Sequence, residues 1–502
     1  MNEVEQKILQ AGEALVGKGL VEVLTTAKIG FWSAPSSRAP DAILLAEAVG
    51  EVFGRLWSDF EASGPLADEF LQSVKSVAAS GGRNIRCANE WGGNYQFVVS
   101  IGSEVPPGAG PGIRLWASGW EAGVDVPDPF AGIPNPIMAL HCASVGACES
   151  FKSIFSQALS GRAQSIPQGH RWSAWSQKTG PPPTDGPLNL GEVHLFGVGA
   201  VGHALVWILE QWPHEVSGTL HLIDGDKYDK SNAQRYLGMQ GGDSGTQKVD
   251  SVARRLRARH RDLTVLPHPT EMNKYYHHER PDYKVSIAVA GLDSIELRRQ
   301  LALKLPETVV NMWTSDGAVG ASVLRADGKT ACTYCIYPEE IVRAPDEVGQ
   351  ISKTTSIPPH VVKDLLTSGR VLSTGEAKLL VQRFGGDISL YQLRSLRSIV
   401  GELCATARIP DKATGRDLAV PTSFASALAG IGGFVSLLQA VMDPVVPRPH
   451  WNYSYLNYPL ETNWQFVAPV TDCYLCGDKD VRSLLDSKYG LRPETRSPTE
   501  TP

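Results

Sequence analysis

Glycine and acidic residues in the middle of the chain have the types and spacing of a nucleotide phosphate site. Gly197, Gly199 and Gly202 follow a short apolar run ending at Phe196, which indicates a strand that turns tightly into a helix. Glycine lets the backbone approach phosphates, and a new helix offers unpaired N–H groups and the positive end of its dipole. A second apolar run ends at Asp224, about 20 residues further on, where a carboxylate can accept both hydroxyls of a ribose. The stretch therefore predicts a nucleotide site.

The glycine loop alone does not separate ATP from a nicotinamide dinucleotide, because both sites use this order of strand, loop, helix and acid. Hydride transfer has little use for many charges around the phosphates. A triphosphate with a metal needs them, because its charge must be offset while a carboxylate attacks the α-phosphorus. The alternative is a set of surface charges, and Asp226 could instead cap the loop beyond its strand. The residues that favour ATP are Asp224, Asp226, Asn232, Arg235, Lys248 and Asp293.

At these residues the chain resembles the E1-like adenylating family, which contains ubiquitin-activating enzymes, sulfur-carrier activators and their bacterial relatives. The resemblance covers roughly residues 188–335, with a further match near residue 421. It implies that Asp224 holds the ribose, that Asn232, Arg235 and Lys248 hold the phosphates, and that Asp293 binds Mg²⁺. The family's N-L-N-R-Q reads N-A-Q-R-Y here, so the middle pair and the residue after the arginine depart from the pattern.

The elements that must position these residues alternate between strand and helix from residue 190 to residue 311. This pattern predicts an α/β fold with a Rossmann-like, doubly wound parallel sheet and a nucleotide at the carboxyl ends of its strands. Residues 1 to about 80 read instead as mainly helical, with apolar side chains at helical intervals from Leu45 to Leu56.

Two helices that begin at a proline and are rich in small residues, 135–152 and 421–438, resemble one another. In the E1-like family such a helix closes the adenylation fold, so its repetition indicates a pseudo-dimeric chain with a degenerate N-terminal half. An unrelated helical domain is the alternative reading of that half.

The predicted domains follow from these observations. They are a degenerate adenylation-like domain (1–160), a linker (161–189), an active ATP-binding adenylation domain (190–345), a helical insertion (346–420), a closing helix with a zinc-bound segment (421–490) and a disordered tail (491–502).

Two C-x-x-C pairs predict a structural zinc site. A short spacer lets both thiolates of a pair reach one ion, and two pairs supply four tetrahedral ligands with no position left open. Buried or redox-active thiols are the alternative. The four residues are Cys332, Cys335, Cys473 and Cys476.

Cys404 is the candidate catalytic nucleophile, because the resemblance places the thioester-forming cysteine between the first C-x-x-C pair and the closing helix. A thiolate would take the acyl group from the adenylate as a thioester that stays transferable. The competing interpretation is a cysteine on the apolar side of a helix, made inert by burial. An arginine of the N-terminal half often completes such sites in the family, and Arg83 and Arg86 are candidates.

Composition excludes several functional classes. The 502 residues have 42% hydrophobic and 20% charged content and a net charge of −6, so no broad basic surface for nucleic acid is expected. We expect a cytoplasmic protein without a signal peptide, and an uncharged stretch at 424–442 that packs inside the protein rather than crossing a membrane.

We therefore expect an E1-like enzyme that uses ATP and Mg²⁺ to adenylate the C-terminal glycine of a ubiquitin-like protein and passes it through a thioester to an E2-like protein. The plan resembles most the E1-like proteins of bacterial ubiquitin-like conjugation operons linked to phage defence, acting as a monomer or homodimer. The alternatives are an adenylyltransferase for a sulfur carrier or peptide without an enzyme thioester, an NAD oxidoreductase, and a non-catalytic scaffold.

Overall fold

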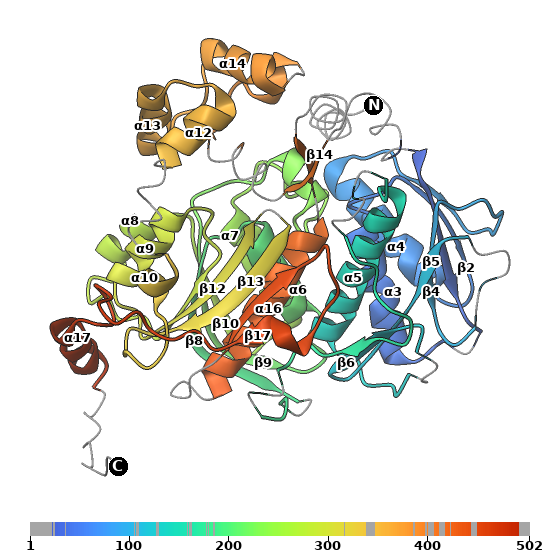
Figure 1. The fold of residues 1–502 in the computed structure, drawn as a ribbon, viewed down its shortest axis with the longest axis horizontal. Helices are drawn as coiled ribbons and strands as arrows, with labels where there is room; N and C mark the ends of the chain where they lie inside the picture. Colours follow the sequence, from blue (N-terminus) through green and yellow to red (C-terminus); the bar gives the residue numbers. More distant parts are fainter. Residues whose placement is uncertain are drawn as a thin grey trace.

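The protein is described by a computed structural model that contains two α/β halves, packed side by side (Figure 1). It describes residue 23 and residues 26–490, with internal gaps at 36, 105, 107–109, 127–129, 158, 160–162, 177, 179, 184–185, 316, 338–346, 385–386, 397–398, 400–405, 411–416, 422 and 443–448. Cys404 and the tail from 491 onward lie outside the described residues.

The N-terminal half is a seven-stranded sheet in the order β3-β2-β1-β4-β5-β6-β7. Neighbouring strands from β3 to β5 are parallel, and β6 and β7 add antiparallel strands at one edge. Its elements are β1 Lys28–Ser33, α3 Pro40–Phe53, β2 Asp59–Ser63, α4 Ala67–Gly81, β3 Arg86–Ala88, β4 Phe97–Ile101, β5 Gly112–Ser118, β6 Glu121–Val124, α5 Pro136–Ile154 and β7 Arg171–Trp172.

The C-terminal half repeats this plan in an eight-stranded sheet with the order β10-β9-β8-β11-β12-β13-β16-β17. The strands from β10 to β12 are parallel and those from β13 to β17 are antiparallel. Its elements are β8 Leu188–Phe196, α6 Ala200–Glu210, β9 Val216–Ile223, η2 Lys230–Gln234, α7 Lys248–Arg259, β10 Leu263–His268, α8 Met272–His278, β11 Ile287–Ala290, α9 Ile295–Leu303, β12 Thr308–Ser315, β13 Ala318–Leu324, α10 Thr333–Ile336, α16 Ser423–Met442, β16 His450–Ser454, η4 Glu461–Asn463, β17 Trp464–Gln465 and α17 Lys479–Tyr489.

The central strands form because their sequences are apolar on both faces. Every residue of β4 (FVVSI) and of β11 (IAVA) is buried. Parallel strands need helices on both faces, and continuous apolar runs of this kind are typical of them. The predicted doubly wound fold and its two related halves are therefore confirmed.

The helices α5 and α16 lie next to each other where the halves meet (Figure 1). Small residues on α16 permit close packing, since a Cβ on Gly430 would lie 2.4 Å from the Cβ of Ala204 in α6. By length and composition α16 is one helix that could cross a membrane, but 94% of its most apolar window is buried inside the protein. This burial agrees with the expected core helix.

An insertion between β13 and α16 carries a small core of its own. Its helices project from the sheet of the C-terminal half (Figure 1) and bury Ile357, Val362, Leu365 and Leu380 among themselves. The described elements are α12 Glu347–Thr355, α13 Pro359–Ser368, α14 Thr374–Phe384, η3 Ile388–Leu390, β14 Thr406–Pro410 and β15 Asp417–Pro421.

The expectation that residues 1–80 are mainly helical is wrong in part. The apolar residues from Leu45 to Phe53 do lie on a helix, α3, but the strands β1 and β2 flank it. Both strands are short, and their pairing with each other and with β4 stabilises them, so tertiary packing overrides the local pattern.

Candidate functional site

The glycine loop joins β8 to α6 at the carboxyl end of the sheet. Gly197 has φ of +88°, and a Cβ there would lie 2.6 Å from the carbonyl oxygen of Gly291, which follows the neighbouring strand β11. A Cβ on Gly202 would lie 2.6 Å from the carbonyl oxygen of Gly197. Glycine is thus required by conformation and by close packing. Gly199 is the N-cap of α6 and has no side chain to bond the first N–H groups of the helix, which leaves them available to an anion.

Asp224 ties this loop to the end of β9. Its carboxylate accepts hydrogen bonds from the backbone N–H of Val198 and of Asp226, each at 2.8 Å. Lys248, the first residue of α7, places its Nζ 2.9 Å from Asp226 and 3.9 Å from Asp224. The structure therefore brings Asp224, Asp226 and Lys248 together beside the glycine loop.

Burial decides the charge states in this group. Burial raises the pKa of Asp224, and the charge of Lys248 opposes that rise. For Lys248, burial alone would lower the pKa, but Tyr236, Asp224 and Asp226 together raise the pKa above its ordinary value. Lys248 is thus a fixed cation, with its side chain only 6% exposed, while that of Asp226 is 72% exposed.

The N-x-x-R residues lie on and just after the short helix η2. Asn232 accepts the backbone N–H of Asp229 through its Oδ1 at 2.9 Å, which stabilises this turn. Arg235 is buried, and its Nη1 has no hydrogen-bond partner among the residues that the structure describes. A buried guanidinium nitrogen without an acceptor is costly, so it indicates a place for an anionic ligand.

The N-terminal half contacts η2 through Arg55, a residue that the sequence analysis does not identify. The Arg55 guanidinium, at the end of α3, donates a hydrogen bond to the carbonyl oxygen of Ala233 and forms an ion pair of 2.5 Å with Glu51. Glu51 also accepts the backbone N–H of Gly238 at 2.7 Å. The N-terminal half thereby fixes the backbone on both sides of Arg235.

The two arginines suggested from the sequence contact residues of the N-terminal half, and their role at the site stays a prediction. Arg83 donates to the carbonyl oxygens of Gly54 and Trp57, within its own half. Arg86 has a 60% exposed side chain that faces Asp59 and Glu61.

Asp293 is exposed and follows β11, directly after the turn that contacts the glycine loop. Arg298 of α9 fixes this turn by donating to the carbonyl oxygens of Ala290 and Leu292. Among the described residues, Asp293 forms no ion pair with the basic residues of the site, so its assignment to Mg²⁺ stays a prediction. Its place at the carboxyl end of a neighbouring strand suits that role.

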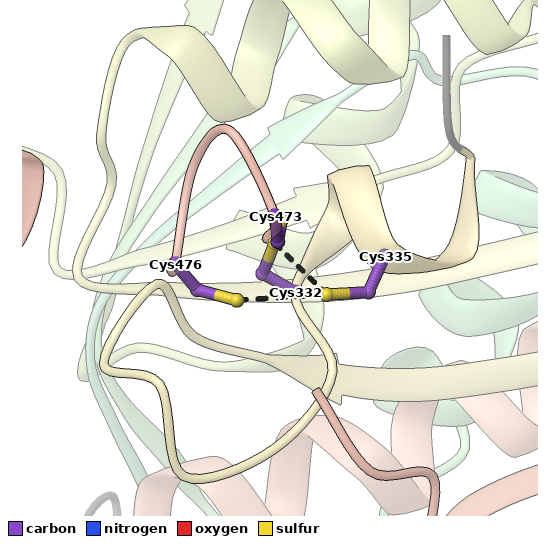
Figure 2. A group of neighbouring side chains, drawn as sticks. All are labelled: Cys332, Cys335, Cys473 and Cys476. Atoms are coloured by element: carbon purple, nitrogen blue, oxygen red, sulfur yellow. Dashed lines mark hydrogen bonds between the residues drawn. The ribbon is translucent and has the colours of Figure 1, made fainter. Parts of the chain in front are cut away.

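The two C-x-x-C pairs meet in space, as Figure 2 shows for the four side chains. The sulfur atoms of Cys332 and Cys473 are 3.5 Å apart, those of Cys335 and Cys476 are 3.5 Å apart, and those of Cys332 and Cys335 are 3.8 Å apart. Four sulfurs about 2.3 Å from one zinc ion would be about 3.8 Å from each other. The backbone N–H of Val470 also points at the sulfur of Cys335, at 3.3 Å. The donor set fits zinc, which would join α10 to the C-terminal segment.

The remaining described cysteines lie in the N-terminal half. Burial raises the pKa of Cys142 and raises that of Cys148 to about 12, which makes both thiols inert. Cys404 is outside the described residues, so the structure does not test its role as a nucleophile.

A second group of metal-compatible side chains lies on the sheet of the C-terminal half, namely Glu192, His194 and His221. The Arg280 guanidinium contacts both Glu192 and His221, which places a cation where a metal ion would have to sit. Burial lowers the pKa of His194 to about 2 and that of His221 to about 4, so both imidazoles are neutral. These three side chains therefore belong to the packed interior of the sheet and do not form a metal site.

Comparisons with known proteins place these residues in a family. The ThiF family model matches residues 187–441, just over half of the chain, from β8 to α16. The uncharacterized protein y4jF of Sinorhizobium fredii (strain NBRC 101917 / NGR234) is 28% identical over 404 residues, 76% of each protein. Two solved structures are more distant: E. coli MccB with ATP (16% identity, 57% of this chain and 67% of that chain, TM-score 0.33) and PaaA (20%, 28% and 42%, TM-score 0.23). On the family match, the chain belongs to the ThiF family.

Proposed function

We propose that the chain is an ATP-dependent adenylating enzyme that activates the C-terminal carboxylate of a peptide or protein. The observation that carries this proposal is the buried Lys248, held beside Asp224 at the glycine loop inside the region that matches the ThiF family. A fixed cation and free helix N–H groups at one loop are suited to a polyphosphate.

The chemistry follows from the charges. A carboxylate oxygen attacks the α-phosphorus of ATP, the bond from that phosphorus to the bridging oxygen breaks, and pyrophosphate leaves with the electron pair. Lys248 and Arg235 offset the negative charge at phosphorus, and Asp224 holds the ribose hydroxyls. Asp293 would hold Mg²⁺, which neutralises phosphate oxygens when bound. The product is an acyl-adenylate, whose AMP is a good leaving group.

The finer assignment takes the substrate to be a ubiquitin-like protein that ends in glycine. Cys404 would then attack the acyl-adenylate, release AMP and hold the acyl group as a thioester for an E2-like partner. The sequence resemblance to bacterial ubiquitin-like conjugation operons supports this reading and a role in antiviral defence. An adenylyltransferase for a sulfur carrier or a peptide would use the same nucleotide residues without the thioester.

ATP–pyrophosphate exchange with a candidate substrate tests the adenylation step. We expect Asp293→Ala to lower the exchange rate by about 10²-fold or more, since metal and charge stabilisation at phosphorus is lost. Asp262→Ala is the matched control, because Asp262 is an exposed aspartate just before β10, at the opposite end of the strands. Absence of exchange in the unmodified protein, or equal exchange in both variants, would contradict the proposal and favour an oxidoreductase or a scaffold.

The thioester is tested separately with ATP and the substrate on a non-reducing gel. A thioester-forming enzyme gives a thiol-sensitive adduct that is absent in Cys404→Ala, while ATP–pyrophosphate exchange continues. An adduct that survives this substitution removes Cys404 from the mechanism. Exchange without any adduct supports the adenylyltransferase alternative.

A further inference from the structure

We propose that Tyr236, the residue where the sequence departs from the family pattern, positions the phosphates of the nucleotide. Its ring contacts both basic residues of the site, and its hydroxyl donates a hydrogen bond to a phosphate oxygen at the start of α6. This inference rests on the proposed adenylating function and adds a residue that recognises the substrate's phosphates.

The position of Tyr236 follows from η2. Its backbone N–H bonds the carbonyl oxygen of Asn232 at 2.9 Å, which turns the side chain inward, and the residue is only 5% exposed. Its ring packs on the ring of His203 in α6, with centroids 4.5 Å apart. Its hydroxyl oxygen lies 3.9 Å from the place where a Cβ on Gly199 would be. Tyr236 therefore reaches from η2 to the helix N-terminus that we assign to phosphate.

The Tyr236 ring also touches the two cations. Lys248 Nζ lies 5.6 Å from the ring centroid and the guanidinium carbon of Arg235 lies 5.8 Å from it. Both distances are within the range of a cation–π interaction. Two like charges repel each other when no ligand separates them, and a shared aromatic face offsets part of that repulsion. The ring thus helps to keep both cations at the site.

Within the part of the chain that the structure describes, no residue forms a hydrogen bond with the Tyr236 hydroxyl. The neighbouring Tyr228 differs, because its hydroxyl bonds the Nε2 of His203, whose Nδ1 lies 2.9 Å from the carbonyl oxygen of Gly199. Phenol groups in the interior usually find a partner. The Tyr236 hydroxyl at Gly199 and the buried Arg235 Nη1, which has no partner among the described residues, therefore supply two donors that one anionic ligand could receive.

Isothermal titration of the full chain with ATP, inorganic triphosphate and adenosine tests the role of Tyr236 without any turnover. Tyr236→Phe keeps the ring and removes the hydroxyl. We expect it to bind ATP and triphosphate about tenfold more weakly, the effect of one hydrogen bond to a charged group, and to bind adenosine as the unmodified protein does. Tyr236→Leu also removes the ring and should weaken triphosphate binding further. The control is Tyr474→Phe, because Tyr474 is 70% exposed and lies beside the cysteine cluster.

The outcomes separate the two proposals. If the unmodified protein binds neither ATP nor triphosphate, both the adenylating function and the role of Tyr236 are overturned. If it binds them and Tyr236→Phe binds them equally well, only the role of Tyr236 is overturned. A loss that is as large for adenosine as for triphosphate would mean that Tyr236 supports the fold of the pocket, and it would overturn phosphate recognition as well.

Discussion

Replacing Arg55 with methionine should destabilise the protein more than any exposed arginine does. Arg55→Met keeps most of the side-chain volume but removes the guanidinium, whose side chain is 0% exposed. The change leaves Glu51 as a buried carboxylate without its cation, which costs about 3–5 kcal/mol. It also leaves the carbonyl oxygen of Ala233 without its donor, which costs about 1–3 kcal/mol. Because both losses come from one group, they are not additive, and we expect the free energy of unfolding to fall by about 4 kcal/mol.

Urea unfolding followed by tryptophan fluorescence measures this loss. Arg86→Met is the matched control, because its side chain is 60% exposed and its ion pairs with Asp59 and Glu61 are worth at most about 1 kcal/mol. Adding Glu51→Gln to Arg55→Met should restore about 1 kcal/mol or more, since a neutral amide needs no cation and can still accept the N–H of Gly238. Equal losses in Arg55→Met and Arg86→Met would refute the assignment of a buried link between the halves.

The same substitution should weaken nucleotide binding from a distance. Arg55 contacts the backbone of η2 between Asn232 and Arg235, so its loss lets both side chains move away from the phosphates. We expect a higher KM for ATP in pyrophosphate exchange at a temperature where the variant is fully folded. An unchanged KM would show that η2 keeps its conformation without the N-terminal half.

Two further predictions concern the cysteine cluster and the buried histidines. Atomic emission should find about one zinc ion in each purified chain. The Cys473→Ser variant should lose this zinc ion and have a lower Tm, whereas the control Cys87→Ser, in the N-terminal half, should keep the ion. A full zinc content in Cys473→Ser would contradict the site. The folded-state pKa values of about 2 for His194 and about 4 for His221 lie below the ordinary 6.5, so the unfolded chain binds more protons below pH 6.5 and stability falls as the pH drops from 6.5 towards 4. The groups that face this pair are Glu192, His268, Tyr275 and Arg280, and Glu279 in turn forms an ion pair with His268 when that imidazole is protonated. His194→Phe should reduce the loss between pH 6.5 and pH 4.5 by about 2 kcal/mol in urea unfolding, and an unchanged pH dependence would contradict a buried neutral imidazole.

The chemistry of the glycine loop could be predicted from the sequence because its constraints are local. Gly197 needs a positive φ, and Asp224 follows its strand directly, so spacing along the chain is enough to identify both. The cysteine cluster could be predicted as well, because the spacing of each C-x-x-C pair lets both thiolates reach the same metal ion. In both cases the residues that matter are near one another in the sequence or carry a distinctive spacing.

The supports of the site could not be predicted, because they depend on contacts between distant residues. Arg55 bonds a backbone carbonyl 178 positions away, and a carbonyl carries no signature in the sequence. The histidines of β8 and β9 stack because His194 and His221 face each other in register, which becomes visible only when the strands are paired. Strands β1 and β2 could not be predicted for the same reason, because their stability comes from hydrogen bonds to neighbouring strands of the sheet.

The N-terminal half has the same strand order as the C-terminal half but different residues at the ends of its strands. Its β1 is followed by residues 34–39 (APSSRA), without a glycine loop, and its β2 is followed by Gly64 where β9 is followed by Asp224. The N-terminal half therefore lacks, at these two positions, the residues that we propose to bind phosphate and ribose in the other half. Its α4 nevertheless packs against η2, where a Cβ on Gly81 would lie 3.0 Å from the Cβ of Ala233. A change at Gly81 or Arg55 is therefore expected to displace Asn232 and Arg235, although both positions lie in the other half of the chain.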